Sequence, residues 1–137
     1  MDSEYTVLES PDFYKHYKKV RKKYKHTFDN DFKLAIQVIT KKLAILNGNY
    51  LNLPGTPKTV DGLGEKATHA VVYTRVHIRE AQDKVGRLVY IVDKSRERIY
   101  LIDVYYKSER EDPDKAICAK GHMDYDAFIE AEEKQKE

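Results

Sequence analysis

Three runs rich in valine, isoleucine and tyrosine follow one another in the second half of the chain and constrain its fold most. They occupy about residues 70–79, 87–93 and 98–107, and their composition is typical of β-strands. The connections between them are polar and short, which favours an antiparallel meander over parallel strands joined by long crossovers. The sequence therefore predicts a mainly antiparallel sheet at the centre of the fold.

Two amphipathic helices are predicted in the first half of the chain, after a short strand at residues 5–9. The first helix starts at Ser10-Pro11-Asp12, where a capping hydroxyl and a proline suit a helix N-terminus. The second helix follows a cap at residues 29–31 and ends at Asn47-Gly48, which favours the left-handed conformation of a C-cap. Because few residues join them, the helices are expected to form a hairpin that covers one face of the sheet.

The remaining segments are a loop and a helical C-terminus. Residues 49–66 contain two prolines and three glycines and are predicted to be a loop. A short helical turn is expected near residues 115–119, and a helix from about Asp124. The 137 residues suffice for one domain only, over residues 1–137. The expected class is α+β in the order β-α-α-β-β-β(-α), with the second face of the sheet left open to a partner.

Charge is distributed unevenly along the sequence. The net charge of +2 is the sum of +7 through Ser108 and −5 from there to the end. An acidic helical extension at about 109–137 is therefore expected to screen a basic body, so truncation before Asp124 is expected to raise RNA affinity at low salt. The densest basic segment spans residues 15–25, with seven Lys and Arg and no acid. Its candidates for RNA contact are Lys18, Lys19, Lys22 and Lys23.

Side-chain alternation in the first of the three runs separates an apolar set at residues 72, 74, 76 and 78 from a polar set. Arginine, histidine and tyrosine side chains of this kind bind the phosphate backbone of a nucleic acid. The alternative interpretation is an ordinary solvated face of a sheet, which has the same composition. Arg87 begins the next run and Lys107 ends the third, so antiparallel pairing is expected to bring both near the end of the first run. Gathered cations repel one another, which favours an anionic ligand. The polar set comprises Tyr73, Arg75, His77 and Arg79.

The order and spacing of several short motifs resemble the RelE/HigB toxin superfamily. The motifs are VHIR at residues 76–79, GRLVY at 86–90 and IYLIDVYYKSERE at 99–111. Members of the superfamily typically have x-x-I-R, then G-x-R-(V/L)-(I/V)-Y, then I-x-L-(L/I)-x-x-Y-x-K-x-E-x-E. The loop at 55–64 is similar to the segment that precedes these strands, so the resemblance covers about residues 50–115.

The resemblance implies the toxin of a type II toxin–antitoxin pair, a ribosome-dependent mRNA interferase. In that family the 2′-hydroxyl attacks the adjacent phosphate without a metal, leaving a 2′,3′-cyclic phosphate and a 5′-hydroxyl. Arg79, Arg87 and Lys107 match the cations that would stabilise the transition state. His77 has an imidazole suited to proton transfer near neutral pH. Arg75 and Tyr105 are further candidates for RNA contact, Tyr105 by stacking on a base or positioning a phosphate.

The family's C-terminal catalytic residue has no clear equivalent. Many relatives place a tyrosine or histidine shortly after K-x-E-x-E, whereas His122 and Tyr125 come later here. They are candidates for this catalytic role, or else a loop histidine and a tyrosine in a helix core. Two alternatives to the nuclease stay open, namely a toxin of the same fold that binds and inhibits gyrase, and a non-catalytic RNA-binding module.

Partners and location follow from the resemblance and from composition. The implied partners are mRNA, the ribosome and a cognate antitoxin, acidic or of the helix-turn-helix type. The histidines do not cluster with other metal ligands, and no nucleotide-binding glycine motif is present, so neither a metal nor a small-molecule cofactor is expected. One cysteine, Cys118, lies in an apolar patch and is expected to be buried and inert. With no disulfide, membrane span or signal peptide, a cytoplasmic location is expected.

Overall fold

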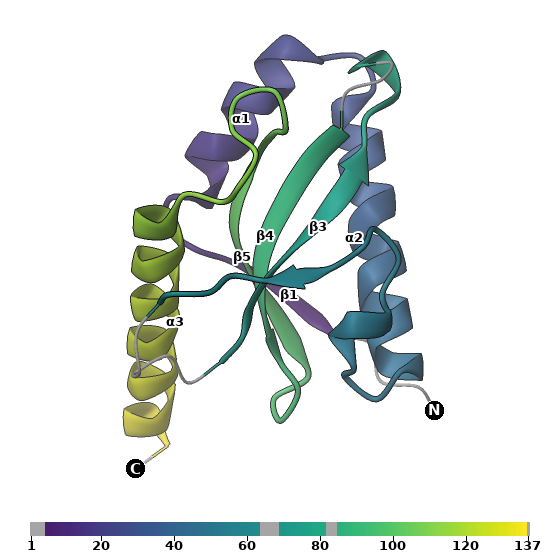
Figure 1. Cartoon of the computed structure of the whole chain (residues 1–137). Coiled ribbons are helices and arrows are strands. Elements are labelled where there is room, and N and C mark those ends of the chain that lie inside the picture. Colours follow the sequence, from purple (N-terminus) through teal and green to yellow (C-terminus); the bar gives the residue numbers. More distant parts are fainter. Residues whose placement is uncertain (1–4, 64–68, 82–84, 137) are drawn as a thin grey trace.

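The three runs form the central strands of a five-stranded sheet in the described part of the chain, in the order β1-β5-β4-β3-β2 (Figure 1). The structure is a computed structural model that describes residues 5–63, 69–81 and 85–136. The predicted antiparallel meander is confirmed, and the sheet is mixed because β1 runs parallel to β5. The strands are β1 (Thr6–Glu9), β2 (Lys58–Thr59), β3 (Val71–His77), β4 (Val85–Asp93) and β5 (Arg98–Tyr106).

The two predicted helices are α1 (Phe13–Lys23) and α2 (Phe28–Ile45), and they cover one face of the sheet. The predicted C-cap of α2 is confirmed: Asn47 and Gly48 have positive φ, and the Gly48 N–H donates to the Leu43 carbonyl at 2.9 Å. The start of α2 differs from the prediction, because fully buried Phe28 already belongs to the helix. The carboxylate of Asp31 binds Arg79 instead of capping the helix.

The second face of the sheet is not left open as predicted, because α3 (Lys115–Gln135) packs against it. The helix is continuous, whereas the sequence predicted two separate helical segments around Gly121. A methyl group at Gly121 would lie 2.6 Å from Cγ2 of Ile102, so this glycine permits close approach to β5 rather than ending the helix. The predicted acidic extension therefore contributes one face of α3 to the core, where Cys118, Gly121, His122 and Tyr125 are buried. The side chains buried between α3 and the sheet are Val71, Val89, Ile91, Tyr100, Ile102, Tyr105, Cys118 and Tyr125.

The edge of the sheet at β3 is covered over only part of its length. Within the predicted loop, β2 pairs with Val72 and Tyr73 of β3, and the Arg75 N–H donates to the Gly55 carbonyl at 3.0 Å. The loop also contains a short 3-10 helix, Tyr50–Asn52. Residues 64–66 of the predicted loop and 82–84 of the predicted turn lie outside the described residues. No described helix is both long and apolar enough to cross a membrane.

Candidate nucleic-acid interface

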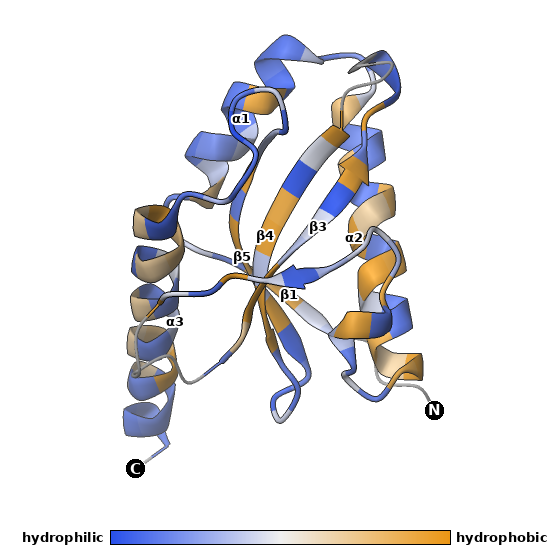
Figure 2. Ribbon diagram, viewed as in Figure 1, coloured by the Kyte–Doolittle hydropathy of each residue, from blue (hydrophilic) through white to orange (hydrophobic). Residues whose placement is uncertain are grey.

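Arginines on neighbouring strands meet at the end of the sheet that lies away from α3. In the register of the sheet, Arg75 of β3 pairs with Arg87 of β4, and Arg87 pairs with Tyr105 of β5. His77 is exposed and lies two residues further along β3 on the same face. Figure 2 shows hydrophilic segments side by side on β3 and β4 at this end. We call Arg75, His77 and Arg87 the cationic row.

Arg87 is buried without a compensating charge. The exposed fraction of Arg87 is 8%. Among the described residues, its Nε atom has no hydrogen-bond partner and its guanidinium group has no ion-pair partner. Its guanidinium carbon lies 5.5 Å from the centre of the Tyr73 ring, a favourable but partial compensation. A buried cation without an anion is energetically unfavourable, more so with Arg75 in register beside it. This arrangement indicates a site for an anionic ligand.

Tyr105 and Arg110 complete the buried part of this site. The Arg110 guanidinium lies 4.0 Å above the Tyr105 ring, and it forms an ion pair with Asp103. The Tyr105 hydroxyl has no hydrogen-bond partner among the described residues. Burial raises its pKa above the ordinary value, although Arg87 and Arg110 oppose the increase. The hydroxyl is therefore a protonated donor, and the buried ring covered by Arg110 does not offer the base-stacking surface predicted from the sequence.

Asp103 links this cluster to α1. The register of β4 and β5 shifts between Val89 and Tyr90, so Val89 pairs with Asp103, Tyr90 pairs with Leu101, and Ile102 has no partner in β4. Asp103 is 1% exposed and lies 3.6 Å from Nδ1 of His16 on α1. Burial raises the pKa of Asp103, although His16 and Arg110 act in the opposite direction. Neither Arg110 nor His16 was identified in the sequence as a site residue, since neither belongs to an alternating strand pattern.

Arg79 does not join the cationic row, so the predicted convergence of Arg79, Arg87 and Lys107 is wrong in this respect. Strand β3 ends at His77, and strand alternation does not extend to Arg79. The backbone N–H and Nε of Arg79 donate to Asp31 of α2 at 2.9 and 2.7 Å. Lys107 is exposed, and its N–H donates to the Val85 carbonyl, which makes it a diagonal neighbour of Arg87 in the register.

His122 and Tyr125 lie on the buried side of α3, away from the cationic row. Nε2 of His122 accepts a hydrogen bond from the His69 N–H at 3.2 Å, and its Nδ1 lies 3.2 Å from Asp126. The Tyr125 hydroxyl donates to Asp93 and accepts from Nε of Arg98 at 2.8 Å. Asp93 pairs with Arg98 in the register, at the opposite end of β4 from Arg87. Both side chains are buried: Tyr125 lies in a helix core, as the second interpretation of the sequence had it, whereas His122 belongs to α3 and not to a loop.

The basic helix α1 exposes a separate positive surface. Lys18, Arg21, Lys22 and Lys25 line a concavity of about 510 Å³ together with Asp29. The other two predicted RNA contacts have protein partners nearby. Lys19 lies 3.9 Å from Glu109, and the Lys23 ammonium lies 5.2 Å from the centre of the Tyr106 ring.

The described residues hold no group of three or more His, Cys, Asp or Glu side chains that suits a metal ion. Cys118 is buried as predicted, and burial raises the pKa of its thiol to about 12. No family model matches the chain, and neither a curated protein nor a solved structure shows significant similarity to it.

Proposed function

We propose that this chain is an RNA-cleaving toxin of the RelE/HigB type, which acts on mRNA at the ribosome and is neutralised by a cognate antitoxin. The observation that supports this proposal best is Arg87, buried without an anionic partner among the described residues and in register with Arg75. The phosphate of an RNA backbone supplies the missing negative charge. The succession of helix hairpin and meander agrees with what the motif resemblance implies, and the motifs themselves provide the link to toxins.

The side chains around the cationic row provide the chemistry of a metal-independent cleavage. In this scheme Arg75 and Arg87 bind the scissile phosphate and stabilise the charge that develops on the phosphorane. His77 is exposed and takes the proton from the attacking 2′-hydroxyl as its oxygen bonds to phosphorus. The bond from phosphorus to the 5′-oxygen breaks, and that oxygen takes up a proton from solvent water and leaves as the 5′-hydroxyl. Tyr105 is buried, and its ring holds the Arg110 guanidinium at this end of the sheet. Lys107 and Arg110 add positive charge at the same end of the sheet, which holds the backbone on either side of the cleaved bond.

A toxin that binds without cleaving is the second candidate, and one observation favours it. His122 and Tyr125, the candidates for a C-terminal catalytic residue, lie on the buried side of α3. The described cationic row then retains a single imidazole, that of His77. Such a toxin uses the same cations to hold an anionic target, and inhibition of DNA gyrase is the form that the resemblance implies.

Replacing Arg87 with methionine tests the proposal, because it separates function from stability. Methionine has a similar length and no charge, so we expect the Arg87→Met variant to unfold at the same or a higher temperature. Cleavage of mRNA in a reconstituted translation reaction, followed by primer extension, is expected to fall about 100-fold or more. Lys41→Met removes an exposed charge from α2 and serves as the matched control.

Two results would count against the nuclease assignment. Cleavage at the wild-type rate by folded Arg87→Met protein would place the reaction elsewhere. Wild-type protein that inhibits DNA supercoiling by gyrase but produces no new mRNA 5′ ends would favour the binding-only toxin. Growth arrest on expression is expected for either toxin, so the two biochemical readouts decide between them.

A further inference from the structure

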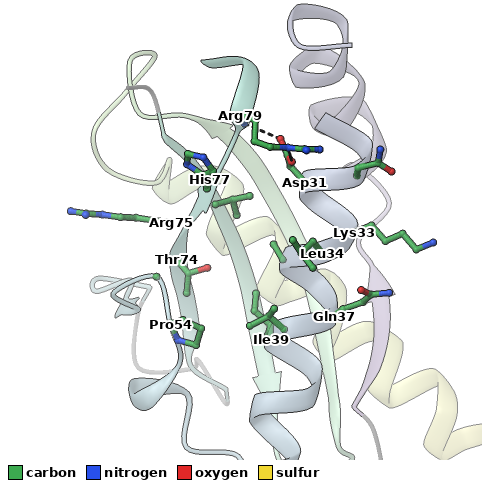
Figure 3. A pocket seen from close by; sticks show the side chains of 15 residues that line it. Asp31, Lys33, Leu34, Gln37, Ile39, Pro54, Thr74, Arg75, His77 and Arg79 are labelled. Atoms are coloured by element: carbon green, nitrogen blue, oxygen red, sulfur yellow. Dashed lines mark hydrogen bonds and ion pairs between the residues drawn. The ribbon is translucent and has the colours of Figure 1, made fainter. Parts of the chain in front are cut away.

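A groove of about 670 Å³ lies between α2 and β3, and Arg75 and His77 of the cationic row line it on the β3 side (Figure 3). Its floor is apolar. Leu34 and Ile39 extend from α2 toward β3, and Pro54 closes one end. Leu34 is 61% exposed, a large apolar side chain on the protein surface. Exposed apolar side chains that line a concave surface mark a binding site more often than isolated ones do.

The groove borders an unpaired stretch of strand edge. The Arg75 N–H is bonded to Gly55, but β2 does not extend beyond Tyr73 and leaves the end of β3 uncovered within the described residues. Because backbone groups alternate in direction along a strand, the N–H and carbonyl of His77 point outward at this edge. The Thr74 hydroxyl lines the groove, is 1% exposed and has no hydrogen-bond partner among the described residues. A strand edge of this kind is a template for another chain.

Most of the charged side chains that border the groove are cationic. They include Lys33, Arg75 and Arg79 against one carboxylate, Asp31, which Arg79 already binds. Figure 3 shows Arg79 directed toward Asp31, and Arg75 directed away from α2. The rim therefore complements negative charge, whereas the floor complements apolar side chains.

We propose that this groove binds an extended, acidic segment of a partner protein. The backbone of the segment pairs with the edge of β3 at His77, its apolar side chains cover Leu34 and Ile39, and its carboxylates face Arg75 and Arg79. A peptide fits better than RNA, because a strand edge and an apolar floor offer nothing to a phosphate backbone. Arg75 and His77 also belong to the cationic row, so a bound segment blocks access of RNA. That blocking rests on the proposed function, whereas the binding itself does not.

The test uses a labelled peptide of about eight alternating leucine and glutamate residues, which places its leucines on one side of a strand. The full-length protein, enriched in ¹⁵N, is titrated with the peptide to millimolar concentration without RNA. We expect amide shifts in residues 33–39 of α2, in residues 74–77 of β3 and in residues 78–79, which follow β3. Leu34→Glu is expected to weaken binding about tenfold or more, since it adds a like charge and removes an apolar contact. Ile45→Glu is the matched control, because Ile45 is 70% exposed on the same helix and does not line the groove.

Several outcomes would overturn this inference. They are no shift at millimolar peptide, shifts confined to other surfaces, or equal affinity of the wild-type and Leu34→Glu proteins. Equal binding of a peptide with lysine in place of glutamate would refute the acidic partner. If Leu34→Glu instead weakened binding of polyuridylate and left peptide affinity unchanged, the groove would be an RNA site. None of these results depends on cleavage, so a failure here is distinct from a failure of the nuclease proposal.

Discussion

Gly121 is a point of very close approach between α3 and the sheet, and replacing it with alanine tests how this helix packs. The added methyl group would lie 2.6 Å from Cγ2, 2.7 Å from Cγ1 and 2.9 Å from Cδ1 of Ile102. Ile102 is 1% exposed in the second core, so its side chain has little room to move. Alanine favours a helix over glycine by about 0.8–1.0 kcal/mol, but overpacking a core costs about 1–3 kcal/mol. We expect Gly121→Ala to lower the free energy of unfolding by about 1 kcal/mol.

Guanidinium unfolding followed by circular dichroism measures this change, with two companion variants. Ala127→Gly lies at an exposed position of α3 and reports helix propensity alone, with an expected loss of about 1 kcal/mol. Ile102→Ala removes the clashing atoms. In that background the added methyl group is expected to become neutral or stabilising, which appears as a coupling energy in a double-mutant cycle. Stabilisation by Gly121→Ala in the wild-type background would refute the reasoning, since it would show that α3 does not approach β5 this closely.

Three further predictions concern α3 and its surroundings. Burial alone would raise the pKa of Asp93, but hydrogen bonds from Tyr125, Ser95 and Arg96 outweigh it and lower the pKa from 3.8 to about 2. The ionised Asp93 carboxylate therefore stabilises the folded state above about pH 4, and this contribution is lost as the pH falls toward 2. Asp93→Asn should make the free energy of unfolding less dependent on acid pH and lower it by about 2 kcal/mol at pH 7. The thiol of Cys118 should resist a thiol reagent at pH 8 until denaturant is added, and rapid labelling of native protein would contradict its burial. Truncation before Asp124 should abolish cooperative thermal unfolding, because it removes fully buried Tyr125; an unchanged melting curve would contradict this.

The meander and the helix hairpin were predictable because local patterns determine them. Strand alternation and the left-handed cap at Asn47-Gly48 are properties of neighbouring residues, and both predictions are confirmed for the described residues. The prediction for Arg79 was wrong because this residue follows the end of a strand, where side chains no longer alternate. Its position is instead determined by a hydrogen bond to Asp31, a carboxylate that is distant in the sequence. The sequence likewise did not predict that α3 continues through Gly121. A glycine is required there because the helix approaches Ile102, which lies some twenty residues earlier in the chain.

The candidate site was predictable in part, for the same reason. Arg87 and Lys107 are diagonal neighbours in the register, as antiparallel pairing predicted, whereas the pairing of Arg75 with Arg87 was not predicted. Arg110 follows the end of β5, in a segment without periodicity, so nothing in the sequence places it above the Tyr105 ring. His122 and Tyr125 had a pattern compatible with either a catalytic or a structural role, and only the path of α3 buries them both.

The parallel pairing of β1 with β5 affects the order in which the chain completes its fold. Thr6 pairs with Arg98, so the partner of the first strand emerges from the ribosome about ninety residues later, several seconds at ordinary rates of synthesis. Helices α1 and α2 are made in that interval, before the sheet that buries their apolar stripe exists. During synthesis the chain therefore presents a helical hairpin with exposed Phe13 and Phe28, a surface that chaperones recognise. The same delay postpones completion of the site around the cationic row, because Tyr105, the register partner of Arg87, lies on β5.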